Sequence, residues 1–278
     1  VLRDAAAAGL SAYPGSGGLL DLDMTIDPDL SHLITHDPDG SFTALDRDET
    51  LGFAAAHVRS RQCVLSELWV LPQHRGRGAG DALLAKVLAY GERSGARSTL
   101  AMVPPEGAVQ SLLLSHGLRP ICPVYRYLLG TESAEEVGRA LARLLPGQEV
   151  SSDLLKRRGQ ADLDRIDQVT RGITREVDHL YWLKTRQLKA AFVRQGERNA
   201  AYAYGGQDQA GPVGGSTREA ALAAVGWALS LSASQRAKPV RMLVPAPFSG
   251  AIDTLEESDA TIEATFLLYG RDVGLAFD

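Results

Sequence analysis

The chain has 278 residues, long for one domain and sufficient for two of about 140 residues each. Its net charge of −5 argues against a nucleic-acid-binding protein, and aromatic residues at 6% leave the cores to aliphatic side chains. Two cysteines, Cys63 and Cys122, do not make a disulfide framework and favour a reducing, cytoplasmic location. No apolar run reaches the roughly 18 residues that span a membrane, so no membrane contact is expected.

The first elements are a helix and a hairpin. A short helix is expected over residues 27–36, and residues 5–10 have weaker helical character. Residues 37–40, Asp-Pro-Asp-Gly, predict a turn. Strands over 41–45 and 50–59 would then form a hairpin through the charged residues 46–49.

The stretch from residue 62 to residue 90 predicts a strand, a glycine-rich turn and a helix. Residues 62–71 are mainly apolar, which suits a central strand covered on both faces, and Pro72 ends it. The helix from 81 to 90 has apolar residues at helical spacing, and Gly91 is a plausible stop. Glycines in the turn let a ligand approach the backbone, and the free amides of the new helix favour an anion. With Arg75 and Arg77 beside them, the turn predicts a diphosphate site, the alternative being a turn without a ligand.

The spacing of the turn decides which kind of diphosphate site is expected. A P-loop requires Gly-Lys-Ser/Thr, whereas this turn ends Gly80-Asp81 and does not support nucleotide hydrolysis. The glycines form G-x-G-x-G, not the G-x-G-x-x-G of dinucleotide-binding proteins. Gln73-x-x-Gly76-x-Gly78, repeated in frame as Arg75-x-x-Gly78-x-Gly80, resembles the acyl-CoA pyrophosphate loop of the GNAT superfamily of N-acetyltransferases.

This resemblance implies acetyl-CoA as cosubstrate and no metal. The backbone around the central strand's end would polarise the carbonyl, and the turn would hold the diphosphate. The cofactor-binding residues are then Leu68, Trp69, Val70, Gln73, His74, Arg75, Gly76, Arg77, Gly78, Ala79 and Gly80.

The second half of the chain repeats the first. After a strand at 97–103, a helix at 107–116 and a strand at 125–129, a helix over 131–145 begins with a Ser133-x-x-Glu136 capping box. Residues 191–204, 242–247 and 266–270 then parallel 42–56, 101–105 and 126–130, which indicates a tandem duplication. Residues 205–217 replace the Arg/Gly turn, with no arginine and with Pro212, so the second copy is expected to be degenerate. Its helices are expected over 163–183 and over 218–231, the latter capped by Ser216 or Thr217.

The expected fold class is therefore α/β, with two tandem GNAT-like domains, each a mixed, mostly antiparallel sheet flanked by helices. The predicted divisions are an acetyl-CoA-binding domain at 1–130, a helical connector at 131–147 and a degenerate domain at 148–278. The protein is expected to be a monomer or a homodimer.

Glu67 is the candidate catalytic base. Strict strand alternation would place it on one face with Cys63, Leu65 and Trp69, where desolvation raises a carboxyl pKa. A structural ion pair is the alternative, and His57 and His74 are weaker candidates. The resemblance implies a tyrosine that protonates the departing thiolate, but leucine occupies that position, Leu113. Tyr125, Tyr127 or solvent would have to replace it.

The function predicted is transfer of an acetyl group from acetyl-CoA directly to a primary amine. The acceptor would be a small amine, an antibiotic, or a protein N-terminus or lysine. An alternative of another class is a non-catalytic acyl-CoA-binding module whose second domain serves as an interaction surface.

Overall fold

The computed structural model describes residues 28–149, 154–207, 209–235 and 239–273, which form two compact units. The described part of unit 1 comprises residues 28–121 and 267–273, and unit 2 comprises residues within 122–266. The helical pattern noted at 5–10 lies outside the described residues.

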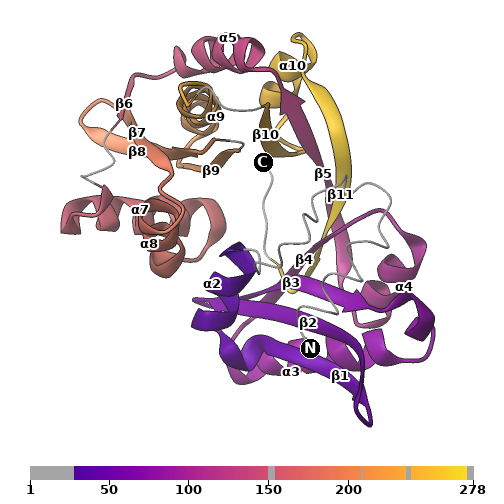
Figure 1. The fold of residues 1–278 in the computed structure, drawn as a ribbon. Coiled ribbons are helices and arrows are strands. Elements are labelled where there is room, and N and C mark those ends of the chain that lie inside the picture. Colours follow the sequence, from indigo (N-terminus) through magenta and orange to yellow (C-terminus); the bar gives the residue numbers. More distant parts are fainter. Residues whose placement is uncertain (1–27, 150–153, 208, 236–238, 274–278) are drawn as a thin grey trace. The chain divides into compact units, whose positions relative to one another are not determined.

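Unit 1 is built on the predicted hairpin and central strand (Figure 1). Strands β1 (Ser41–Asp46), β2 (Glu49–Arg59) and β3 (Gln62–Val70) are antiparallel, and β3 runs parallel to β4 (Ser98–Val103). The α-helices in the described part of unit 1 are α2 (Pro28–His36), α3 (Ala79–Arg93) and α4 (Gly107–Ser115). Helix α3 packs its apolar stripe against one face of the sheet, through Leu83, Leu84, Val87 and Leu88.

Each repeat contributes its last strand to the other unit. In unit 1, β4 pairs antiparallel with residues 267–271 of β11 (Thr261–Arg271). In unit 2, β10 (Val240–Pro245) pairs antiparallel with residues 124–129 of β5 (Arg119–Leu129). The larger sheet has the strand order β1-β2-β3-β4-β11-β5-β10. Each unit therefore contains chain from both halves of the sequence.

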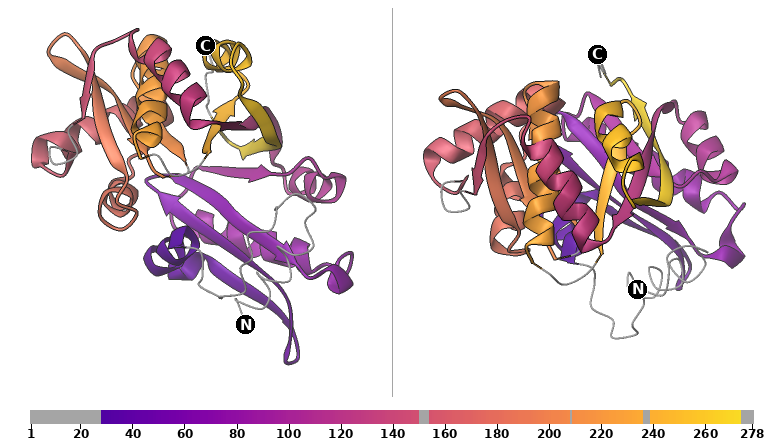
Figure 2. Two further views of the ribbon diagram at one scale, coloured as in Figure 1. Left: turned by 45° about the horizontal axis from the view of Figure 1, so that its top comes forward. Right: turned by 90° about the horizontal axis from the view of Figure 1, so that it is seen from above.

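Unit 2 repeats the element order of the first copy. Strands β7 (Lys189–Gln195), β8 (Arg198–Gly205) and β9 (Ala210–Gly215) precede α9 (Arg218–Ala233), β10, α10 (Ser249–Glu256) and β11. Strand β6 (Gly147–Glu149) pairs with β7, while α7 (Arg157–Arg171) and α8 (Glu176–Lys184) precede the repeat. Helix α5 (Thr131–Ala142), which contains most of the expected connector, lies alongside α9 in Figures 1 and 2, and Val137 and Leu141 enter the unit 2 core.

Several local expectations were wrong. Gly91 does not end α3, which runs to Arg93: a Cβ at Gly91 would lie 3.0 Å from that of Cys63, so this glycine allows close helix–strand packing. Ser133 caps nothing, because α5 begins at Thr131 after Gly130. The helix expected over 163–183 is two helices, since Gly172, with φ +69°, ends α7.

The glycine-rich residues 205–217 were expected to be the counterpart of the Arg/Gly turn. The structure instead places residues 210–215 in strand β9, paired with β8. The counterpart of the long turn in unit 1 is therefore reduced to the short step from Gly215 to the start of α9.

Candidate active site

The turn between β3 and α3 is anchored by two side chains. His74 is buried, at 8% exposure, and its Nε2 lies 2.9 Å from Oε1 of Glu49 at the start of β2. Arg75 Nε donates a hydrogen bond of 3.1 Å to the carbonyl of Val70, the last residue of β3. Both predicted site residues thus hold the turn against the sheet, while Gln73 and Arg77 are exposed.

The glycines of this turn leave its backbone open. Gly76 and Gly78 have φ of +73° and +88°, and a Cβ built on either would meet no atom within 4 Å. Gly78 is the N-cap of α3 and supplies no side chain, and the first α3 residue whose amide reaches its carbonyl is Ala82. Among the described residues, the amides of residues 79–81 therefore have no acceptor, which suits an anion.

One negative charge lies in the first turn of α3. It belongs to Asp81, whose Oδ1 lies 2.8 Å from Nε2 of His116. This contact ties the start of α3 to the end of α4. The imidazole engages the carboxylate, which would otherwise oppose an anion, while Arg75 and Arg77 provide positive charge nearby.

Strands β3 and β4 separate next to the turn. Their parallel pairing runs from Gln62–Ser98 to Leu65–Ala101 and stops there. Beyond Leu65, the edge of β3 that faced β4 has no strand partner among the described residues. This stretch contains Leu68, Trp69 and Val70, the residues predicted to polarise a carbonyl. They pair with β2 on the other edge of β3.

A β-bulge at Ser66 sets the direction of Glu67. Ala55 opposes Glu67 and Ala56 opposes Leu65, so Ser66 is the extra residue. Cys63 and Leu65 belong to the core beneath α3, whereas half-buried Glu67 does not, so the expectation that Glu67 shares their face was wrong. Glu67 does share a face with Trp69, whose Nε1 donates to Glu67 Oε2 at 2.5 Å.

The other candidates for acid or base are held by different contacts. His57 Nδ1 is 2.9 Å from Ser66 Oγ. Tyr127 is buried in the unit 2 core and its hydroxyl donates to Glu256, and Tyr125 packs against the same core. Leu113 is fully buried in unit 1.

Tyr269 is a residue that the sequence did not suggest for this site. It reaches unit 1 on β11, where it pairs with Ala101, the last β4 residue that is bonded to β3. Its side chain joins the core under α3, and its hydroxyl donates to Gln110 of α4 at 3.0 Å. Only the exchange of last strands brings Tyr269 to the point where β3 and β4 separate.

Two further classes of site find no support in the described part of the chain. No group of three or more His, Cys, Asp or Glu residues there is arranged to hold a metal ion. No helix among the described residues has the length and apolar character needed to span a membrane.

The described part of unit 1 is thus an α/β fold in which a glycine turn with open backbone lies beside two separating strands, an arrangement that suits an elongated, anionic cosubstrate. Residues 13–117 match the acetyltransferase (GNAT) family, and this region contains both features. The first repeat thus matches the acetyltransferase (GNAT) family, whose members use acyl-CoA as cosubstrate and acetylate amines.

Solved structures share the fold over nearly the whole chain. A putative acetyltransferase from Pyrococcus horikoshii has a TM-score of 0.70 and 14% identity, over 98% of this chain and 87% of that one. A GCN5-related N-acetyltransferase from Sphaerobacter thermophilus gives 0.61 and 14%, over 97% and 90%. A tandem GNAT protein from the clavulanic acid biosynthesis pathway gives 0.57 and 13%, over 99% and 95%. No curated protein matches the sequence.

Proposed function

We propose that this protein transfers an acetyl group from acetyl-CoA directly to a primary amine, at the site formed by β3 and the turn before α3. The observation that carries the proposal is the combination of an open, left-handed glycine turn with an unpaired edge of β3 in one unit. When bound, acetyl-CoA supplies the acyl thioester.

The turn fits the diphosphate of this cosubstrate. The backbone amides from Gly76 to Gly80 would donate hydrogen bonds to its oxygens, and Arg77 with the remaining donors of Arg75 would add charge-assisted hydrogen bonds. His74, held by Glu49, would fix the turn in place. Leu68, Trp69 and Val70 would present backbone amides along the open edge of β3, where one of them would polarise the thioester carbonyl.

Glu67 would take the proton of the acceptor amine, directly or through one water. The bulge at Ser66 directs its carboxylate away from the core beneath α3, and the indole of Trp69 orients it. The acceptor would therefore approach from the face of β3 that carries Glu67 and Trp69.

Tyr269 is our candidate for the hydroxyl that protonates the departing thiolate. It lies at the row where β3 and β4 separate, and Gln110 orients its hydroxyl. This would replace the tyrosine that is leucine at position 113. The general acid of the unit 1 site would then come from β11, in the second half of the sequence.

Direct transfer is favoured over an acyl-cysteine route. Burial raises the pKa of the Cys63 thiol to about 11, and burial also raises the pKa of Cys122. Only the thiolate is an effective nucleophile, so neither cysteine of the sequence suits that role near neutral pH.

The test is an assay for thiol release from acetyl-CoA in the presence of a panel of small amines, peptides with free N-termini and lysine peptides. We expect release that depends on one class of amine. Calorimetry with CoA is run alongside, because CoA binding without thiol release on any amine would instead support the non-catalytic acyl-CoA-binding module.

A further inference from the structure

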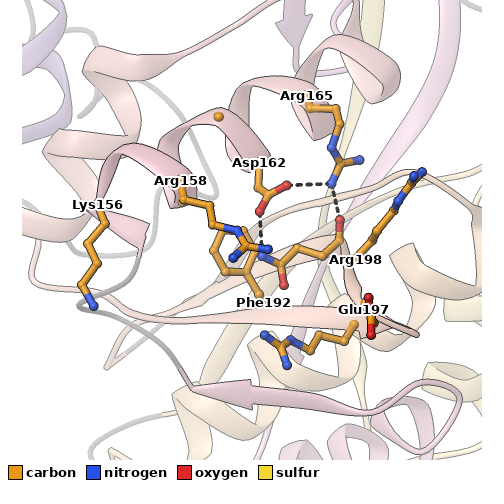
Figure 3. A pocket seen from close by; sticks show the side chains of 11 residues that line it. Lys156, Arg158, Asp162, Arg165, Phe192, Glu197 and Arg198 are labelled. Atoms are coloured by element: carbon orange, nitrogen blue, oxygen red, sulfur yellow. Dashed lines mark hydrogen bonds and ion pairs between the residues drawn. The ribbon is translucent and has the colours of Figure 1, made fainter.

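Unit 2 contains a basic pocket that the acetyl-transfer site does not use (Figure 3). It has a volume of about 500 Å³ and lies between α7 and the hairpin of β7 and β8. Its lining includes five cationic side chains: Lys156, Arg158, Arg165, Arg194 and Arg198. With two carboxylates, Asp162 and Glu197, the lining has a net charge of +3, whereas the whole chain has −5.

Arg165 and Asp162, both in the pocket lining, form an ion pair with each other. Arg165 Nη2 binds Asp162 Oδ1 at 3.1 Å and also donates to the carbonyl of Asn199. The second oxygen of Asp162 accepts from Asn199 Nδ2 at 2.8 Å. Figure 3 shows this closed triangle between α7 and β8, which fixes one wall of the pocket and leaves Asp162 little capacity for the other arginines.

Three guanidinium groups remain. Among the described residues, the side chains of Arg158, Arg194 and Arg198 form no hydrogen bond or ion pair, and all three are exposed. Glu197 is the only carboxylate left in the lining to offset them, and it is itself exposed. Guanidinium forks match phosphate oxygens in a bidentate way and remain charged at all physiological pH values. Like charges gathered around one cavity are stabilised when a polyanion lies between them.

We propose that this pocket binds a small molecule that carries two or more phosphate groups. The volume lies in the range of ordinary ligand sites, and Phe192, almost fully buried, gives the pocket an apolar part beside its charges. Arg158 from α7 and Arg194 and Arg198 from the hairpin supply the phosphate contacts, and Arg165 stays with Asp162. The site is independent of acetyl transfer, since all its residues belong to unit 2.

Calorimetry with inorganic tripolyphosphate on the full chain tests the proposal. The titration uses the Gly78→Val background, which removes the diphosphate turn of unit 1 as a competing site. We expect one bound tripolyphosphate per chain at low salt, with affinity that falls as salt is raised. The double variant Arg158→Gln/Arg194→Gln should weaken binding at least tenfold.

Arg157→Gln is the matched control, because Arg157 lies on the same helix but does not line the pocket. It should bind like its parent, and sulfate should bind far more weakly than tripolyphosphate. Absence of tripolyphosphate binding, binding unchanged in the double variant, or equal affinity for sulfate would each overturn the proposal. The thermal midpoint of each variant shows whether it is folded, and failure of this test leaves the acetyl-transfer site unaffected.

Discussion

Each unit has a strand that leads into a helix, β3 into α3 in unit 1 and β9 into α9 in unit 2. The two junctions differ in how the first turn of the helix is capped. In unit 1 the N-cap is Gly78, which leaves the first amides of α3 without an acceptor among the described residues. In unit 2 the N-cap is Thr217, whose hydroxyl accepts from the amide of Ala220 at 3.2 Å. One helix start is open to an anion and the other is closed by its own side chain.

The glycines of the two junctions show the same contrast. Gly76 and Gly78 of unit 1 face open space, whereas a Cβ on Gly214 or Gly215 would lie within 2.7 Å of Tyr202 or Ala221. The carbonyls of Val213 and Gly215 accept hydrogen bonds from Arg171 and Thr170 of α7. Glycine content alone therefore does not make a ligand site, because the glycines of unit 2 serve internal packing.

The β-bulges of the two units differ in the residue that lies beside them. In unit 1 the bulge lies beside the Ala55–Glu67 pair, and in unit 2 beside the Ala203–Val213 pair. A valine thus stands where the first copy has its candidate base. We therefore expect acetyl transfer at the first junction only.

The largest effect is expected for Glu67→Gln, which keeps the shape of the side chain and removes its basicity. Turnover should fall by roughly 10²–10⁴-fold while acetyl-CoA affinity stays nearly unchanged, because Glu67 does not reach the diphosphate turn. Steady-state kinetics and calorimetry on one preparation measure both. A variant with normal turnover and a lowered melting temperature would show that Glu67 is structural, and the base would then be ordered water.

Gly78→Val should weaken acetyl-CoA binding by well over tenfold. It places a β-branched side chain at φ +88°, in the space that the diphosphate would occupy. Gly95→Val is the matched control: Gly95 has φ +79°, faces open space and follows the other end of α3. Both variants should lose a similar stability, about 1–2 kcal/mol, but only Gly78→Val should lose affinity. Equal affinities in calorimetry would mean that the turn is not the site.

Tyr269→Phe should lower turnover about tenfold, toward the small end of general-acid effects because a thiolate leaves readily. The change keeps the ring in the core and removes the hydroxyl that contacts Gln110. Gln110→Leu, which removes only the partner of that hydroxyl, should have a smaller effect on turnover. If Tyr269→Phe changes the melting temperature but leaves the rate unchanged, solvent protonates the thiolate.

The smallest expected effect is a difference between the two units in how their stability depends on pH. Burial lowers the pKa of His179 below its usual value although Asp167 opposes this, so the unfolded state binds the proton more readily. Stability from this residue is therefore lost as the pH falls below about 6.5. In unit 1, burial alone would raise the pKa of Asp37, but hydrogen bonds from Arg59, Val58 and Tyr90 lower it. The stability that the Asp37 carboxylate gives to the folded state is lost only as the pH falls below about 3.9.

Denaturant unfolding at pH 7 and pH 5, followed by tryptophan fluorescence, tests this contrast. Trp69→Phe leaves the two tryptophans of unit 2, Trp182 and Trp227, as reporters. Their midpoint should be lower at pH 5 than at pH 7. An unchanged midpoint would mean that His179 does not gain a proton when unit 2 unfolds.

Local chemistry in the sequence predicted much of unit 1 and part of unit 2. Both hairpins, the central strand and the Thr217 cap follow from alternation, turn residues and capping, which act over a few positions. The bulge at Ser66 was not predictable from alternation, because it depends on the register with β2. The place of Tyr269 was missed for a larger reason: it depends on pairing between residues more than 160 positions apart. The predicted divisions at 130 and 148 stay a prediction.

The most direct test of the account is the number of acetyl-CoA molecules that one full-length chain binds, measured by calorimetry with and without Gly78→Val. The full chain is required, because residues 146–278 alone would lack β5, whose pairing with β10 completes unit 2. We predict one site, which Gly78→Val removes. Two sites, or one site that survives Gly78→Val, would place acetyl-CoA elsewhere in the chain, at the second junction or in the basic pocket of unit 2, and contradict the account.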